Sequence, residues 1–314
     1  MKKLFAAFLC ALAGVLAAAD AAVLRYVPDS TIAMTGIDVA ALLQHPDLAS
    51  AMNQPENRQK RQDFENSVGV KLNDLKQVFI LVDASGRSSL LVKVDPGMNV
   101  EQILKRSEVS FKKIRSGKYS VIQLQNPVKG NRMIEFTELA PGVIFAGEMG
   151  STASLLNTGI GRAQELAAVV KAVPAAPVWF AFVNLFKDAG GKVSDPRSLY
   201  LTFDFGGENK RDCFLEVVMT CGKPEGAKIM QGMVPLYLNM GLAMLVTDPQ
   251  LCKELTEGVS FAIKGSTLTV KVAVTEQTGR KLADYLQANS GRLLRRHAGM
   301  ADDSVEVPAP AGDK

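Results

Sequence analysis

Short apolar runs, many of them alternating with polar residues, recur along the chain between turns rich in Gly, Pro, Asn and Ser. This pattern is typical of β-strands. It predicts strands at 31–38, 77–83, 88–95, 111–114, 119–125, 132–139, 142–146, 178–186, 198–205, 213–221, 259–264 and 267–274. Short turns such as Ala84–Arg87 and Gly265–Ser266 join several neighbours, so these pairs are expected to form antiparallel hairpins.

Helices are predicted between groups of strands. Their expected ranges are 39–44, 46–67, 100–106, a segment from Ser151 that is interrupted at Gly159–Gly161 and resumes at 162–173, a long segment that opens at Pro224, and 276–289. Asn99 followed by Gln102 is the pattern of a capping box, which fixes the start of the third helix.

The order of elements repeats after Pro174–Pro177, which we interpret as a linker. Strand 178–186 corresponds to 31–38, the strand pair 198–221 to 77–95, and the hairpin 259–274 to 111–125. The predicted fold class is therefore α+β, with two similar halves, each an antiparallel sheet with helices packed on one face. The halves are expected at 20–174 and 175–290, followed by a basic helix end and disordered tail at 291–314.

Three features also resemble a known group of proteins. These are Tyr26-Val-Pro-Asp29 before a strand, a strand that runs into Gly147-Glu148 before an apolar helix, and the doubled order of strands, helix and hairpin. In these features the chain resembles exported bacterial proteins of unknown function with a duplicated α+β body. The resemblance implies architecture and export, and no activity.

The first residues have the three parts of a secretory signal peptide. Lys2 and Lys3 precede an uncharged, mostly apolar run from Leu4 to Leu16, and small residues follow, with cleavage expected near Ala19. The apolar run is too short to cross about 30 Å of hydrocarbon. We therefore expect a periplasmic or secreted protein, and exclude residues 1–19 from the fold.

Charge and cysteine content narrow the function further. The formal net charge of +4 falls to +2 when Lys2 and Lys3 are removed, so no nucleic-acid partner is expected.

Three cysteines follow the signal peptide, which permits one disulfide. Cys213 and Cys221 lie too far apart on one strand to pair, so Cys213–Cys252 is the favoured bridge, and three reduced thiols are the alternative.

A long uncharged stretch, Ile229–Thr247, needs its own interpretation. It approaches the roughly 20 residues of a membrane-spanning helix, but Pro235, its glycines and its place in the repeated pattern favour a buried core helix. The alternative is a helix that faces lipid or an apolar ligand. In that case four methionines would line the ligand-binding site: Met230, Met233, Met240 and Met244.

No pattern for catalysis, a cofactor or a metal is found. His45 and His297 are far apart in sequence and are interpreted as surface residues, so no metal site is predicted. Gly147–Thr152 lacks the lysine of a phosphate-binding loop and is interpreted as a helix cap. Glu135 and Glu138 are expected on opposite faces of a strand, where they cannot share a substrate.

The sequence therefore favours an exported soluble protein without catalytic activity, which has a structural or binding role in the cell envelope. A carrier of an apolar ligand or lipid is the first alternative and predicts an apolar cavity under residues 229–246. A hydrolase without a local motif is the second and predicts a cleft with converging polar side chains. The partner, an envelope protein or a lipid, and the oligomeric state are left open.

Overall fold

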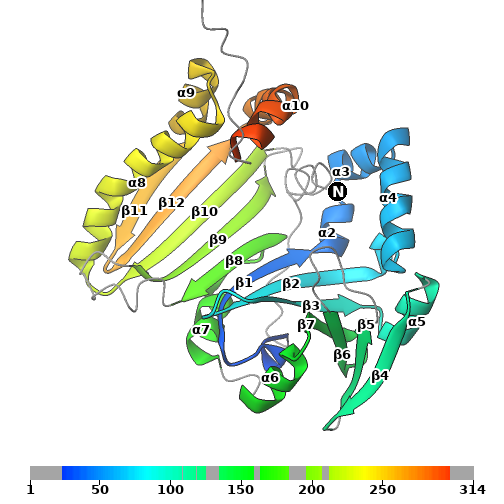
Figure 1. Ribbon diagram of the computed structural model, residues 1–314. Helices are drawn as coiled ribbons and strands as arrows, with labels where there is room; N and C mark the ends of the chain where they lie inside the picture. Colours follow the sequence, from blue (N-terminus) through cyan, green and yellow to red (C-terminus); the bar gives the residue numbers. More distant parts are fainter. Residues whose placement is uncertain are drawn as a thin grey trace, which may run out of the picture.

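The computed structural model describes residues 23–107, 109–117, 119–124, 134–158, 163–183, 196–206 and 212–297. Its strands form one antiparallel sheet (Figure 1) in the order β11-β12-β10-β9-β8-β1-β2-β3-β7-β6-β5-β4. Their bounds are β1 Thr31–Asp38, β2 Leu75–Asp83, β3 Ser88–Val94, β4 Phe111–Ser116, β5 Tyr119–Leu124, β6 Ile134–Ala140, β7 Val143–Glu148, β8 Val178–Val183, β9 Pro196–Gly206, β10 Asp212–Cys221, β11 Val259–Lys264 and β12 Thr267–Val274.

The α+β class is thus confirmed, but the two expected sheets are one continuous sheet. Strands β1 and β8 join them by antiparallel pairing, with Gly36 opposite Trp179. The join is close because glycine has no side chain, so the Trp179 indole can cover the Gly36 backbone. The expected linker is part of this join: Ala176 is buried, and the Pro177 carbonyl accepts a hydrogen bond of 2.8 Å from the Asp38 amide.

The helices begin and end largely where capping residues predict. Asp38 caps α2 through a 2.7 Å bond from the Ala41 amide, and Asn99 and Gln102 form the predicted capping box. The helix expected at 46–67 is split, because Pro55 starts a new helix after Asn53 and Gln54. The bounds are η1 Val23–Tyr26, α2 Val39–Leu43, α3 Pro46–Met52, α4 Pro55–Val68, η2 Leu72–Asp74, α5 Val100–Arg106, α6 Ser151–Thr158, α7 Gln164–Ala172, α8 Pro224–Leu245, α9 Pro249–Glu257 and α10 Glu276–His297.

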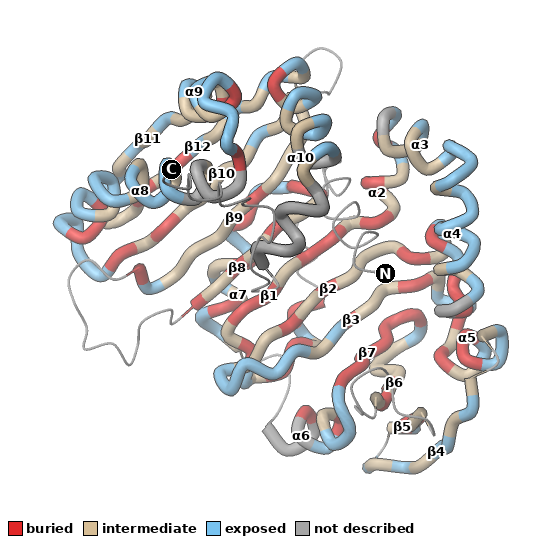
Figure 2. The backbone as a smooth tube through the Cα atoms, turned by 45° about the horizontal axis from the view of Figure 1, so that its top comes forward, coloured by how far each residue is buried: buried red, intermediate tan, exposed pale blue. Residues whose placement is uncertain are grey.

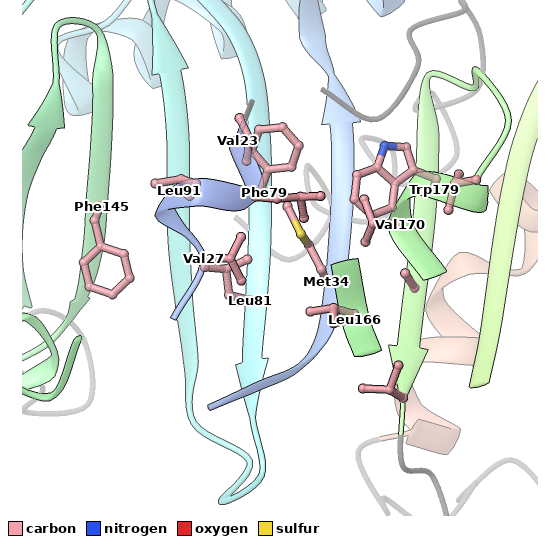
Figure 3. Packing of buried hydrophobic residues seen from close by; sticks show 14 of the residues in the cluster. Val23, Val27, Met34, Phe79, Leu81, Leu91, Phe145, Leu166, Val170 and Trp179 are labelled. Atoms are coloured by element: carbon pink, nitrogen blue, oxygen red, sulfur yellow. The ribbon is translucent and has the colours of Figure 1, made fainter. Parts of the chain in front are cut away.

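Helices cover both faces of the sheet, and not one face as expected. We call the face of the sheet that bears Met34, Phe79 and Trp179 the first face. There, η1, α6 and α7 enclose the main core, which includes these three residues (Figure 3). The second face carries the side chains that alternate with these. There, α2 and α5 cover the strands of the N-terminal half, whereas α8, α9 and α10 cover β10, β11 and β12 (Figures 1 and 2).

Strand order also corrects the expected correspondence of hairpins. Strand β12 lies beside β10, as β7 lies beside β3. The hairpin β11–β12 therefore occupies the place of β6–β7, and not that of 111–125, which forms the additional hairpin β4–β5 at the far edge.

Within the described residues, no helix is both long enough and apolar enough to span a membrane. The segment expected as a buried core helix is α8. It packs on the sheet through Met230 and Val234, but it is not buried all round, as described below.

Candidate functional site

Strand β8 is apolar at every position, yet its two sides differ in burial. Trp179, Ala181 and Val183, which face the first face, are at most 5% exposed. Val178, Phe180 and Phe182, which face the second, are all half-buried. A strand without polar residues is typical of a sheet covered on both sides. Here one side is only partly buried by the described residues, and this partly buried apolar surface is a candidate contact surface.

The open side of β8 belongs to a wider apolar surface. Pairing registers place one residue from each strand in a single row across the second face. From the β4 edge to the β11 edge this row consists of Lys113, Ile122, Phe136, Ala146, Leu90, Ile80, Thr35, Phe180, Leu201, Val217, Val270 and Phe261.

In the middle of this row, Thr35, Phe180 and Leu201 belong to none of the described helix-covered clusters, although Leu90 on β3 is more exposed (40%). Helix α2 packs on β2, and α8 packs on β10, β11 and β12, so their clusters lie to either side of β8 and β9. Between them lie half-buried side chains, which we call the central apolar face: Thr35, Ile80, Phe180, Phe182, Leu201 and Phe203. It contains one hydroxyl and no charged group, so it suits an apolar ligand.

Helix α8 adds exposed apolar side chains on the same side of the sheet. Most of the large apolar residues that are exposed in the described part of the chain lie on this helix: Ile229 (46%), Met233 (36%), Leu236 (60%), Tyr237 (56%) and Met240 (48%). Their helical spacing places them along one stripe. A helix that is apolar on all sides is normally buried, so the stripe is a second candidate contact surface.

The four methionines proposed as a ligand lining are divided between two surroundings. Met230 packs with Met219, Leu268 and Val270 in a closed cluster between α8 and the sheet. Met233 and Met240 lie in the exposed stripe, and the side chain of Met244 lies outside the described residues. The described three therefore do not face a common cavity.

A small polar pocket of about 230 Å³ lies beside the hairpin between β2 and β3. Its charged members include Asp83 and Arg87, whose side chains are 2.9 Å apart. Partial burial raises the pKa of Asp83, but hydrogen bonds from Ser85 and Arg87 outweigh it and leave the pKa below its usual value. Asp83 is therefore a poor general base. The pocket is lined by Pro28, Ser30, Thr31, Leu81, Asp83, Arg87, Ser88, Ser89, Phe145, Glu148, Met149, Gly150, Ser151 and Leu155.

The helix α6 begins at Ser151, within the Gly147–Thr152 segment that was interpreted as a helix cap, but the side chain that accepts from its first turn is that of Glu135 on β6. Glu135 is 3% exposed, and its carboxylate accepts hydrogen bonds from the Thr152 amide and the Ser151 hydroxyl at the start of α6. Thr137 and Thr152 also share a buried hydrogen bond of 2.9 Å. The contacts of Glu135 and Thr137 with the start of α6 were not predicted, because they join residues far apart in the chain.

No disulfide joins any two of Cys213, Cys221 and Cys252, so the favoured Cys213–Cys252 bridge is absent. The Cys252 thiol instead donates to the Val246 carbonyl oxygen, 3.2 Å away. Burial, with a smaller contribution from the Asp212 carboxylate, raises the pKa of Cys213 to about 11. A thiol with this pKa is a poor nucleophile at neutral pH.

Two further expectations concern histidine and metal binding. His45 is buried, contrary to the expectation of a surface residue. The signal peptide and the side chains of the basic helix end, Arg292, Arg295, Arg296 and His297, are not described by the structure. Among the residues that the structure describes, no group of three His, Cys, Asp or Glu side chains could hold a metal ion.

Comparison of the chain with protein-family models, with curated proteins and with solved structures finds no match. The candidate site therefore rests on its own geometry: the central apolar face and the exposed stripe of α8, on one side of a single sheet.

Proposed function

We propose that this chain is an exported, non-catalytic binding protein of the cell envelope, which holds an uncharged apolar segment of a protein partner against its second face. The observation that carries this proposal is the asymmetry of β8, which is buried on one side and only partly buried at Phe180 and Phe182 on the other. Because these side chains are already partly buried, covering one of them contributes less than the roughly 1.5–3 kcal/mol of burying a fully exposed side chain.

A protein partner is favoured over a lipid because the surface is open. A carrier would enclose its ligand, but α8 is closed against the sheet by Met230 and Val234. The described pockets of about 230 and 200 Å³ are lined largely by polar residues and are smaller than the roughly 300–1,000 Å³ of usual ligand sites. The stripe on α8 has no basic residue from Ile229 to Leu245 to attract an anionic membrane surface.

A hydrolase is less well supported. The pocket beside the β2–β3 hairpin contains an acid, Asp83, that is already held by Ser85 and Arg87, and Cys213 is kept protonated by burial. Export itself is supported by Lys2, Lys3 and the apolar run after them.

We also propose that the two halves are copies of one unit. Outward from the β1–β8 pair, β1-β2-β3-β7-β6 and β8-β9-β10-β12-β11 follow the same order, and α5 and α8 both follow the third strand on the second face. The likeness to exported proteins with a duplicated body agrees with this arrangement.

The binding proposal is tested with the neutral apolar dye N-phenylnaphthylamine, whose fluorescence rises in apolar surroundings. We expect the wild type to bind the dye, and Phe180→Ser/Leu201→Ser to lose most of the signal while its circular dichroism is unchanged. Phe214→Ser is the matched control, because Phe214 is 41% exposed on the first face. Equal loss in both variants contradicts the proposal.

A second readout separates the two kinds of ligand. Photocrosslinking from a benzoylphenylalanine at position 201, in intact cell envelopes, is expected to give one discrete protein adduct that the same group at position 214 does not give. Adducts with lipid alone would instead favour a carrier.

A further inference from the structure

The two edge strands of the sheet are protected very differently. On β4, the side chains of Lys112, Lys113 and Arg115 are exposed, and such charges prevent edge-to-edge pairing. On β11, the exposed side chains are Ser260, Ala262 and Lys264, and the only charge is at the last residue. One side of β11 pairs with β12, and no described strand pairs with the other side.

We propose that β11 pairs antiparallel with the β11 strand of a second copy of this chain, so that the protein is a two-fold symmetric dimer. The chain already joins two sheet edges in this way, where β1 meets β8. An open strand edge with one terminal charge is the surface that such pairing requires.

The sequence of β11 is self-complementary in the two central registers. Antiparallel pairing brings together residues that point to the same face. If the two-fold axis passes between the two copies of Phe261, Val259 lies opposite Ile263 and Ser260 lies opposite Ala262. If it passes through Ala262, Lys264 lies opposite Ser260. In neither register do two lysines face each other, whereas a β4–β4 pair would place several cations together.

The two-fold symmetry would place the central apolar faces of both copies on the same side of the dimer. A two-fold axis that relates adjacent antiparallel strands runs perpendicular to the sheet, so the second faces of both copies lie on the same side. The dimer would present two central apolar faces to one partner or to two identical ones, which increases avidity without new contacts. The dimer itself does not depend on the binding proposal, because β11 and the central apolar face are separate surfaces.

The experiment compares three forms of the mature protein by light scattering during size-exclusion chromatography, at low to high micromolar concentrations. We expect a wild-type dimer. Ser260→Lys/Ala262→Lys should halve the apparent mass, because it places lysines opposite one another in both registers. Gln62→Lys/Asn66→Lys adds the same charge at exposed positions of α4 and should remain a dimer.

Two results of this experiment would contradict the proposed dimer. A wild-type monomer at all concentrations overturns the proposal, and so does a dimer that persists in the β11 variant, since it would use another surface. Hydrogen exchange gives an independent readout: amides of Val259–Ile263 should exchange more slowly in the wild type than in the β11 variant. Loss of dye binding by the β11 variant is not expected, so failure of the dimer and failure of the binding proposal can be told apart.

Discussion

The His45 ring is stacked on the Phe205 ring, with their centroids 4.4 Å apart and their planes at 27°. His45 follows α2 in the N-terminal half, and Phe205 is near the end of β9 in the other half. His45 is 3% exposed, and Phe203 packs edge-on against Phe205 at 5.6 Å. The stack therefore ties the two halves together at one end of the second face, next to the central apolar face.

Phe205→Ala is expected to lower the free energy of unfolding by about 1–3 kcal/mol, since it removes a half-buried ring and one partner of an aromatic pair. Urea denaturation measures the change. Phe214→Ala is the control, with an expected effect within about 1 kcal/mol, because Phe214 is 41% exposed on the opposite face. Equal losses would mean that the stack contributes nothing beyond ordinary partial burial.

The sequence predicted local features well because their causes are local. The capping box at Asn99 and the turn at Gly265–Ser266 depend on residues within a few positions, and α5 and β11–β12 have the expected bounds. The breaks before Pro55 and Asp248 were missed, although Pro at the first helical position and Asp at the cap are local signals.

Contacts between distant residues could not be predicted from spacing. Pairing of β1 with β8, burial of His45 and capping of α6 by Glu135 depend on the final strand order. The open side of β8 was missed for a physical reason: Val178–Val183 is apolar throughout, and such a strand predicts two covered faces. The uncharged stretch from Ile229 was expected to be a buried core helix, which is wrong for its exposed side, because an almost wholly apolar pattern does not show which side faces the sheet.

Gly36→Ala is expected to destabilise the join between β1 and β8. A methyl group at Gly36 would overlap the Trp179 indole, and overpacking of a buried site costs about 1–3 kcal/mol. Trp179 is the chain's only tryptophan, so its fluorescence maximum should also move as the ring shifts. Gly97→Ala, at a site with open space and no left-handed backbone, should leave both stability and fluorescence unchanged.

Thiol reactivity tests the state of the cysteines. The mature chain is expected to show three free thiols after denaturation without reductant, whereas a single free thiol would mean that a disulfide forms. In the folded protein, the reaction of Cys213 with Ellman's reagent at pH 8 should be roughly a hundredfold slower than that of an ordinary thiol, since its pKa is raised from 9.0 to about 11. Cys213→Ser should remove this slow phase.

The raised pKa of Cys213 also determines how the free energy of unfolding changes with pH. Because the pKa of Cys213 is higher in the folded protein than in the unfolded chain, its contribution to stability is fully present below pH 9. It is lost as the pH rises from 9 to about 11. Cys213→Ser should therefore lose less stability than the wild type over this interval in urea titrations, and parallel losses would contradict the assignment.

The exposed stripe of α8 is expected to serve binding and not folding. Leu236→Gln/Met240→Gln changes side chains that are 60% and 48% exposed, so the free energy of unfolding should change by no more than about 0.5 kcal/mol per site. Leu268→Ala is the opposite case, because Leu268 is fully buried beneath α8 and its truncation should cost about 2–5 kcal/mol. If the stripe belongs to the binding surface, the glutamine variant should bind N-phenylnaphthylamine several-fold more weakly while it unfolds like the wild type. A large loss of stability in that variant would show instead that the stripe is part of the core, and unchanged dye binding would restrict the binding surface to the central apolar face.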